Sequence, residues 1–477
     1  MKGISFLWKE TRLGIAAATL AAGLIGCSDP SIKIAQDYIP ERPDLSSFDK
    51  VLENHIARAE NAIQDGQAPV ARLMRLSRLY HANGFTNEAA ITYEGLTQIE
   101  PENAVWFHRW ATITAGSGYL EEALPLWEYV ISLDPDYFPA RVRLGDALLK
   151  LNRVEEAEIV FKEALDRSPE DPYALVGKAR TFIARAEWET ARGPLERAAE
   201  ASDFRVGVDL LASVYRNLDQ DYRATSLLRS TQFGGFVDIE DPWIDELNDD
   251  CYDPFRLATA GGIAEFRGDL NRGIELMQRA IELEPDKALH HFQIARMREA
   301  RGELAQAETH FREAIRLQDD LADAYVYLIA ILDQQGRPDE AESFLFRGYR
   351  KCQTSPSMRM EMAKYLEATG MRWKALEEVE EAIRLRPNEA GAYLLKARML
   401  LEEQRVNDAV KTYEEALAAE PGNMVALSAL TFNAIENGDR ERASSYIEQV
   451  ERHPRMPEKM VNNLLEKYSD AFEQAGS

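Results

Sequence analysis

The 477-residue chain has few of the residues that build disulfide-linked or metal-bound folds. It contains three cysteines and seven histidines, too few cysteines for a disulfide framework or a four-cysteine zinc site. Basic residues are also in the minority, since 56 Lys and Arg against 81 Asp and Glu give a net charge of -25. Nucleic-acid binding needs a positive surface, so we expect no nucleic-acid partner.

The short motifs of common catalytic sites are also missing. The sequence contains no glycine-rich phosphate loop, no Gly-x-Ser-x-Gly, no His-Glu-x-x-His and no Cys-x-x-Cys. His290, His291 and His310 are the nearest approach to a histidine cluster, and we interpret them as packing or surface residues. We therefore predict a protein that is not an enzyme, with no catalytic residue, metal, cofactor or small-molecule substrate.

The N-terminus reads as a targeting segment. Lys2, Lys9 and Arg12 precede an apolar run from Leu13 to Ile25. As a helix this run is about 20 Å long, too short for a hydrocarbon core of about 30 Å but typical of a signal peptide. It ends in Leu24-Ile25-Gly26-Cys27, which resembles the lipobox of bacterial lipoproteins.

The lipobox resemblance implies a location and an anchor. In that family the cysteine is acylated and becomes the mature N-terminus, so residues 1–26 would be a signal peptide and Cys27 the lipidation site. We expect residues 27–44, which contain three prolines, to be a tether to a membrane facing the periplasm. Ser28 favours the outer membrane. The alternative is a plain signal peptide or anchor helix with an incidental cysteine.

A fixed period of about 34 positions runs through the remaining chain. Prolines recur at Pro101, Pro135 and Pro169, each after an alanine-rich amphipathic stretch. A small residue also recurs with this period: Ala89, Ala123, Ala157, Ala191, Ala224, Gly273, Ala307, Ala341, Ala375, Ala409 and Ala443. Such a position is needed where two antiparallel helices approach closely.

These features resemble the tetratricopeptide repeat, a helix–turn–helix unit of this same period. The resemblance implies an all-α solenoid of about eleven stacked units, since one unit cannot bury its own apolar face. The boundaries that we predict are a capping helix at 45–69, a first sub-array of five units at 70–238, an acidic insert at 239–253, a second sub-array of six units at 254–457, and a C-terminal capping helix at 458–477.

The insert breaks the period and is rich in Asp and Glu. We interpret it as a solvated acidic connector. A calcium site is one alternative, but the segment lacks the alternating Asp/Asn, central Gly and terminal Glu of an EF-hand loop. Its aromatic residues could instead pack on the array or contact a partner. Cys251 lies in it, about three units from Cys352. Because stacked units advance by about 10 Å each, we predict two free thiols.

A basic stripe is the main functional signal. In tetratricopeptide arrays the first helix of each unit lines a concave groove, and the positions that would face it include Arg75, Arg78, Arg109, Arg143, Arg180, Arg216, Arg296, Lys364 and Arg398. Arginine binds carboxylates in bidentate geometry, so this groove is a candidate site for acidic partner segments. The alternative is that these residues pair with acidic neighbours such as Asp146. The lysine–asparagine clamp of chaperone-binding members is missing.

The sequence therefore predicts a lipid-anchored scaffold or adaptor of the bacterial cell envelope that binds protein or peptide partners. Pilotin-type lipoproteins share this architecture, as an analogy. Two alternatives stay open: a soluble cytoplasmic adaptor, or the regulatory part of an enzyme such as a glycosyltransferase. The second is disfavoured because the repeats leave no room for a catalytic domain.

Overall fold

The computed structural model consists of helices and the turns that join them. It describes residues 29–46, 48, 50–66, 68–201, 205–230, 238–420, 422–451 and 458–472. The predicted signal peptide and Cys27 lie outside these residues. In the described part of the chain no helix is both long and apolar enough to cross a membrane.

Eleven helical hairpins follow one another along these described residues, which confirms the predicted all-α solenoid. The first five, units 1 to 5, are α3 (Pro69–Ala82) with α4 (Thr86–Ile99), α5 (Ala104–Gly116) with α6 (Leu120–Leu133), α7 (Phe138–Lys150) with α8 (Val154–Arg167), α9 (Pro172–Ala184) with α10 (Trp188–Ala201), and α11 (Arg205–Asn217) with α12 (Asp221–Ser230).

Units 6 to 11 form the second sub-array. They are α14 (Pro254–Phe266) with α15 (Leu270–Leu283), α16 (Ala288–Ala300) with α17 (Leu304–Leu317), α18 (Ala322–Gln334) with α19 (Pro338–Lys351), α20 (Pro356–Ala368) with α21 (Arg372–Leu385), α22 (Ala390–Glu402) with α23 (Val406–Ala419), and α24 (Met424–Glu436) with α25 (Arg440–Glu451).

Local sequence explains where these helices begin and turn. At the start of α9, the Asp171 carboxylate accepts a hydrogen bond from the Ala174 N–H and Pro172 occupies the first turn. Both features favour a helix start. Between α16 and α17, Gly302 adopts φ +78°, a conformation that glycine reaches without strain.

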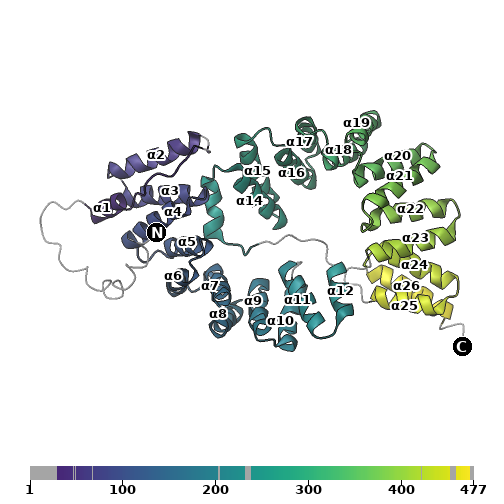
Figure 1. Ribbon diagram of the computed structural model, residues 1–477, viewed down its shortest axis with the longest axis horizontal. Coiled ribbons are helices and arrows are strands. Elements are labelled where there is room, and N and C mark those ends of the chain that lie inside the picture. Colours follow the sequence, from purple (N-terminus) through teal and green to yellow (C-terminus); the bar gives the residue numbers. More distant parts are fainter. Residues whose placement is uncertain are drawn as a thin grey trace.

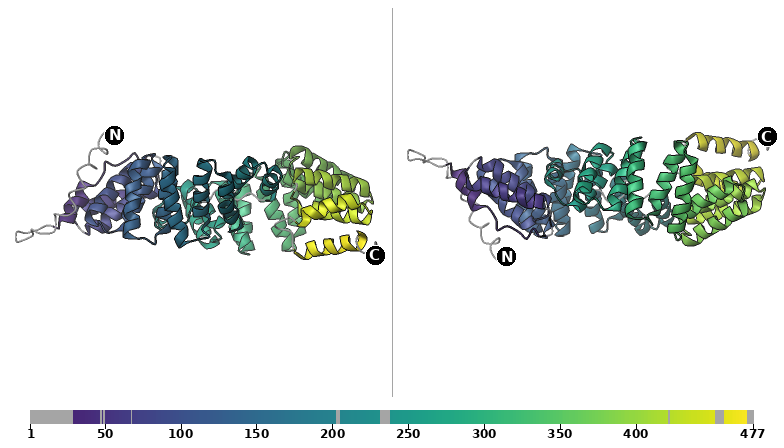
Figure 2. Two further views of the ribbon diagram at one scale, coloured as in Figure 1. Left: turned by 90° about the horizontal axis from the view of Figure 1, so that it is seen from below. Right: turned by 90° about the horizontal axis from the view of Figure 1, so that it is seen from above.

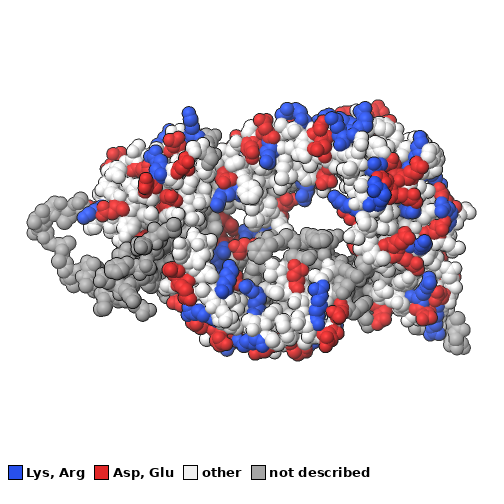
Figure 3. All heavy atoms as spheres, viewed as in Figure 1, with Lys and Arg blue, Asp and Glu red and all other residues white. Residues whose placement is uncertain are grey.

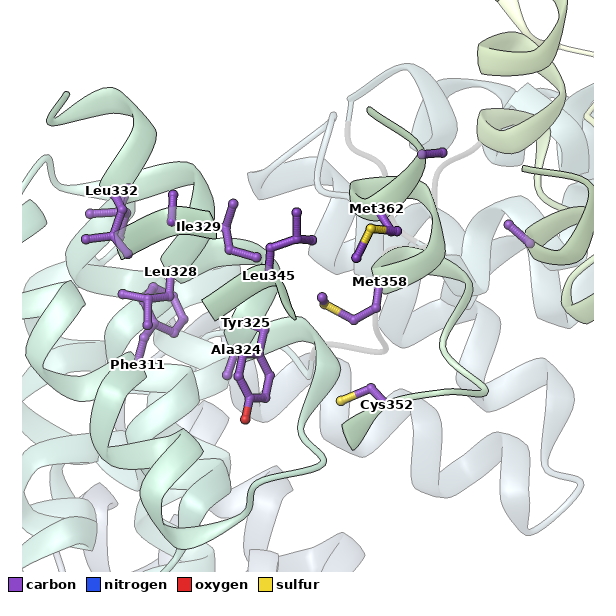
Figure 4. Close-up of a cluster of buried hydrophobic side chains, with 14 of the residues drawn as sticks. Phe311, Ala324, Tyr325, Leu328, Ile329, Leu332, Leu345, Cys352, Met358 and Met362 are labelled. Carbon is purple, nitrogen blue, oxygen red and sulfur yellow. The ribbon is translucent and has the colours of Figure 1, made fainter. Parts of the chain in front are cut away.

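Within each sub-array, the core is a series of contacts between neighbouring hairpins. The repeated small residues are buried, and large side chains fill the space beside them. Phe161 lies so close to Gly145 and Gly177 that a Cβ atom at either glycine would overlap its ring. In the second sub-array, Figure 4 shows Tyr325, Leu328 and other buried side chains meeting between successive helices. Each unit thus covers the apolar face of the next.

The segment predicted to be a tether is instead partly folded onto the array. Helix α1 (Pro30–Asp37) contacts α3 and α4, and Ala35 is fully buried. Tyr38 packs over Gly95, whose missing side chain makes room for the ring. The tether prediction is wrong for residues 30–38, because their apolar side chains pack against α3 and α4. Helix α2 (Lys50–Gln64) caps the same end, packed on α3.

The two sub-arrays form two arcs that begin at the same place. In Figure 1 the first arc runs from α3 to α12, and the chain then returns to the region of α3 and α5 before α14 begins the second arc. Figure 2 shows the whole as an elongated layer seen from its sides. At the far end, α26 (Glu458–Phe472) packs on α24 and α25. The sequence suggested one long curved rod. In the structure the chain instead returns to unit 1 before the second sub-array begins.

Candidate functional site in the inner faces of the two sub-arrays

In Figure 1 the first helices of several units, such as α7, α9, α14 and α16, lie toward the middle of the molecule, and their second helices, α8, α10, α15 and α17, lie outside. Along the inner side of the first sub-array runs the acidic insert, which is described from Asp238 to Asp253. It contains one helical turn, α13 (Pro242–Asp245), and a 3-10 helix, η2 (Glu246–Asp250). Its direction is opposite to the order of the units, because Asp238 lies at unit 4 and Asp250 at unit 1.

Three equivalent arginines hold the carboxylates of this insert. Arg75, Arg109 and Arg143 occupy the same place in units 1, 2 and 3. Arg75 pairs with Asp250, Arg109 with Glu246 at 3.0 Å, and Arg143 with Asp241 at 2.8 Å. Since the units repeat in space as well as in sequence, this acidic segment meets one of these guanidinium groups in each of units 1 to 3.

Further ion pairs of Arg78 and Arg143 add to this row of contacts with the insert. Arg78 forms ion pairs with both Glu246 and Asp250. A second nitrogen of Arg143 contacts Asp238 at 3.2 Å. These contacts join side chains that are far apart in sequence, so the folded-back path of the insert creates them.

Asp241 is the most completely surrounded carboxylate of the insert. It is 1% exposed and accepts hydrogen bonds from His108 Nε2 at 2.9 Å, Arg143 Nε at 2.8 Å and the Tyr137 hydroxyl at 2.5 Å. Burial alone would raise its pKa, but the hydrogen bond from His108, the charge of Arg143 and the bond from Tyr137 lower the pKa below the usual value. Asp241 is therefore held as the carboxylate.

His108 is neutral in this arrangement. Burial lowers its pKa, although Asp241 acts in the opposite direction. Its Nδ1 is buried and has no hydrogen-bond partner among the described residues, so a second proton there would be left without an acceptor. The imidazole thus carries its single proton on Nε2, facing Asp241.

Trp243 anchors the middle of the insert. Its ring stacks on Tyr137 with centroids 3.4 Å apart and planes inclined by 6°. Its backbone carbonyl accepts a hydrogen bond from Arg109 Nε at 2.8 Å. One aromatic and one carboxylate group, two positions apart in sequence, therefore occupy adjoining places on units 2 and 3.

The end of the insert joins the two sub-arrays. Asn83, at the end of α3, donates to the Asp250 carbonyl and accepts from the Tyr252 N–H. Leu247 and Cys251 are buried in a cluster that includes Ala82 of α3 and residues of α14 and α15. The second sub-array therefore starts beside unit 1 and does not continue from unit 5.

These contacts overturn the interpretation of the insert as a solvated connector. Asp241 and Asp250 are buried, and both pair with arginines from which the sequence predicted partner binding. Arg75, Arg78, Arg109 and Arg143 all contact carboxylates of the insert. The carboxylates that they contact belong to the same chain.

The remaining predicted groove residues do not share this site. Arg180 pairs with Asp146 of the preceding unit at 2.5 Å, the alternative that the sequence left open. In the second sub-array, Arg296 pairs with Glu265, Lys364 with Glu361, and Arg398 with Glu367 and Glu402. Arg216 is exposed on α11. The second inner face thus balances its charges locally.

Apolar side chains are exposed on α14 and α16, the first helices of units 6 and 7. Phe255 is 75% exposed, and Phe266 and Leu289 are each 49% exposed. Phe255 and Phe266 are both on α14, about three helical turns apart, a spacing that places them on one side of the helix. Gly262 lies between them, and a Cβ atom there would meet nothing within 4 Å. Figure 3 shows an opening through the molecule beside this sub-array, with largely uncharged surface over α14 and α16.

Other candidate groups have structural surroundings. His291 Nδ1 lies 3.1 Å from His310 Nδ1, and burial lowers the pKa of His310 to about 4. Within the described residues, no three His, Cys, Asp or Glu side chains are grouped to hold a metal ion. Cys251 and Cys352 are free and buried, as predicted, and burial raises the pKa of both thiols.

The sequence placed His108 in the groove and left open that Trp243 packs on the array, but it did not predict that they meet at Asp241. Tyr137 gave no signal, because its contacts depend on the route of the insert. One signal was available: three arginines one repeat apart and an acidic segment of matching length in the same chain.

The stacked helical hairpins are those of a helical repeat protein, and comparison with family models identifies the repeat. Two family models, each described as Tetratricopeptide repeat, match residues 110–172 and 267–476. The chain therefore carries tetratricopeptide repeats.

Individual relatives are distant. The chain is 21% identical over 365 residues to DnaJ homolog subfamily C member 3 of Bos taurus, covering 73% of this chain and 66% of that protein, just under two thirds of its length. It is 25% identical over 350 residues to Cellulose synthase operon protein C of Xanthomonas axonopodis pv. citri, covering 67% of this chain and 23% of that protein. Among solved structures, yeast Tom70 matches with a TM-score of 0.42 and 14% identity, over 85% of this chain and 96% of that one.

Proposed function

We propose that this protein is a lipid-anchored scaffold of a bacterial cell envelope, not an enzyme, and that its repeats bind protein partners on the inner face of the second sub-array. The observation that supports the binding surface is the exposure of Phe255, Phe266 and Leu289 on a face that no described residue covers. Exposed apolar side chains of this size, grouped on one face, mark interaction surfaces. The inner face of the first sub-array is already occupied by the insert.

Anchoring rests on the lipobox-like residues Leu24 to Cys27. Two or three acyl chains on one cysteine give durable membrane attachment, whereas one chain gives only marginal binding. Metabolic labelling with a fatty-acid analogue tests this. We expect label and membrane fractionation for the wild type, and neither for Cys27→Ala. Equal labelling of both proteins would contradict the anchor, and recovery of the wild type in the cytoplasm would favour the soluble adaptor.

Partner binding is tested by a photo-reactive amino acid placed at Phe266 in living cells. We expect cross-linked products from this position and a several-fold loss of them when Phe255 is replaced by Ser. The matched control is a photo-reactive residue at Ile159, which is 59% exposed on α8 of the outer face. Equal products from both positions, or no effect of Phe255→Ser, would contradict the proposed surface.

A further inference from the structure

Residues 238–245, here called the strap, contact units 2 to 4 through ion pairs, hydrogen bonds and the stacked Trp243 ring. Arg267, at the end of α14, binds the strap from the second sub-array. Arg143 contacts Asp238 and Asp241, and the Tyr173 hydroxyl donates to the Asp238 carbonyl at 3.1 Å. The backbone hydrogen bonds of the strap are local, from the Ile244 and Asp245 N–H groups to the Asp241 carbonyl. Among the described residues, the strap thus adds no backbone ladder to the sub-array.

The two halves of the insert are bound differently. Residues 246–253 share an apolar cluster with α3, α14 and α15 through Leu247 and Cys251. The strap has exposed edges, since the Asp238 side chain is 55% exposed and Trp243 borders an open hollow of about 660 Å³. Ion pairs contribute to both halves, since Glu246 also pairs with Arg78 and Arg109. The halves differ in apolar burial: Leu247 and Cys251 are buried, whereas Trp243 and Ile244 of the strap are only half-buried and Ile239 is its buried apolar side chain. The strap can therefore separate from the sub-array while the junction stays in place.

We infer that the strap occupies a peptide-binding site on units 2 and 3, here called the seat, and that another peptide segment can replace it there. The occupant that replaces it is an acidic segment of a partner protein, with an aspartate two residues before an aromatic residue. The seat reads this chemistry with the groups that now hold Asp241 and Trp243: Arg143, His108 and Tyr137 for the carboxylate, the Tyr137 ring for the aromatic side chain, and Arg109 for the backbone carbonyl.

Competition sets the balance between the two occupants. The strap is tethered at its junction, so its effective concentration at the seat is on the order of millimolar or more. A free segment gains access only in the fraction of molecules whose strap is released, so its apparent Kd is the intrinsic Kd divided by that fraction. Release returns the charges of Asp241 and Arg143 to water and leaves neither one buried alone, so a second acidic segment can take the place of the first.

A synthetic peptide tests the seat directly. The probe is fluorescein-labelled Asp-Ile-Glu-Asp-Pro-Trp-Ile-Asp, the sequence of residues 238–245, titrated by anisotropy into the full-length protein. We expect the double variant Asp241→Asn, Trp243→Ala, whose own strap is weakened, to bind the probe at least tenfold more tightly than the wild type.

Two matched controls define specificity. Adding Arg143→Ala to the double variant should abolish binding, whereas adding Arg180→Ala, an inner-face arginine that pairs with Asp146, should leave it unchanged. A probe with Asn in place of its fourth residue should bind at least tenfold more weakly. The proposal would be overturned if the wild type and the double variant bound the probe with equal affinity while the circular dichroism spectrum of the double variant was unchanged.

Hydrogen exchange of the wild type tests release without any substitution. We expect the Ile244 and Asp245 amides to exchange in native buffer well before the core amides of α5 and α7. If these two amides exchanged only with global unfolding, the strap would never leave the sub-array in the folded protein, and the proposal would be overturned.

The inference rests on the proposed partner-binding function, but different experiments contradict the two proposals. Absence of cross-links at Phe266 contradicts the second-array surface, and absence of probe binding contradicts the strap seat alone.

Discussion

The two sub-arrays share one repeat geometry but treat their inner faces in opposite ways. In the first, Arg75, Arg109 and Arg143 recur at one place in successive units and bind the chain's own acidic insert. In the second, the same place holds Thr259, Gln293 and Tyr327, and the charges nearby are neutralised between adjacent units. The residue at one position of the repeat therefore decides whether an array binds an acidic segment or leaves an apolar face open.

The strongest contrast lies in the buried charges of the first sub-array. Asp241→Asn should lower the free energy of unfolding of that sub-array by about 3 kcal/mol, because it removes the buried carboxylate of the Arg143 pair and leaves only the exposed Asp238 beside that guanidinium. Chemical denaturation followed by circular dichroism measures the loss. A loss no larger than that of an ordinary surface substitution, about 0.5 kcal/mol, would show that the Asp241 site does not hold the insert.

Two glycines sharpen the comparison of packing. Gly177→Ala in α9 should cost about 2 kcal/mol, since the new methyl group would overlap the Phe161 ring. Gly262→Ala in α14 should be neutral or add up to about 1 kcal/mol, since its methyl group meets nothing and alanine favours helix. Thermal unfolding of both variants tests this. A destabilised Gly262→Ala would mean that the second inner face is covered.

Acid should weaken the first sub-array through His108. Its folded pKa lies below the unfolded value of about 6.5, so the unfolded chain binds the extra proton more readily. The stability that it contributes is complete above that unfolded value and falls as the pH drops below it. His108→Gln should flatten this pH dependence. Parallel slopes in denaturation series at several pH values would contradict a neutral buried imidazole.

The smallest effect is expected for a pair of the second sub-array. Glu265→Gln removes the partner of Arg296, whose side chain is 42% exposed. Because water screens such pairs, we expect a loss under about 0.5 kcal/mol. Denaturation midpoints compared with those of Asp241→Asn check the difference. A loss as large as that of Asp241→Asn would remove the contrast between the sub-arrays.

The repeats were predictable because their signals are local. The repeat period located the start of each hairpin closely, as at Ala104 and Ala288, because small residues and turn signals act within one unit. The fold of α1 was missed because so short an apolar segment has no repeat pattern of its own, and its packing depends on the surface of α3 and α4. The route of the insert was missed for a related reason: the contact of His108 with Asp241 joins distant parts of the sequence and follows no period.

A double-mutant cycle on Arg143 and Asp241 tests the central claim most directly. The two residues lie 98 positions apart in sequence, and only a folded-back insert brings them together. Unfolding of the wild type, Arg143→Ala, Asp241→Ala and the double variant isolates their interaction. We predict a coupling energy of about 1.5 kcal/mol or more. Additive effects, with no coupling, would show that the acidic insert does not occupy the inner face of the first sub-array.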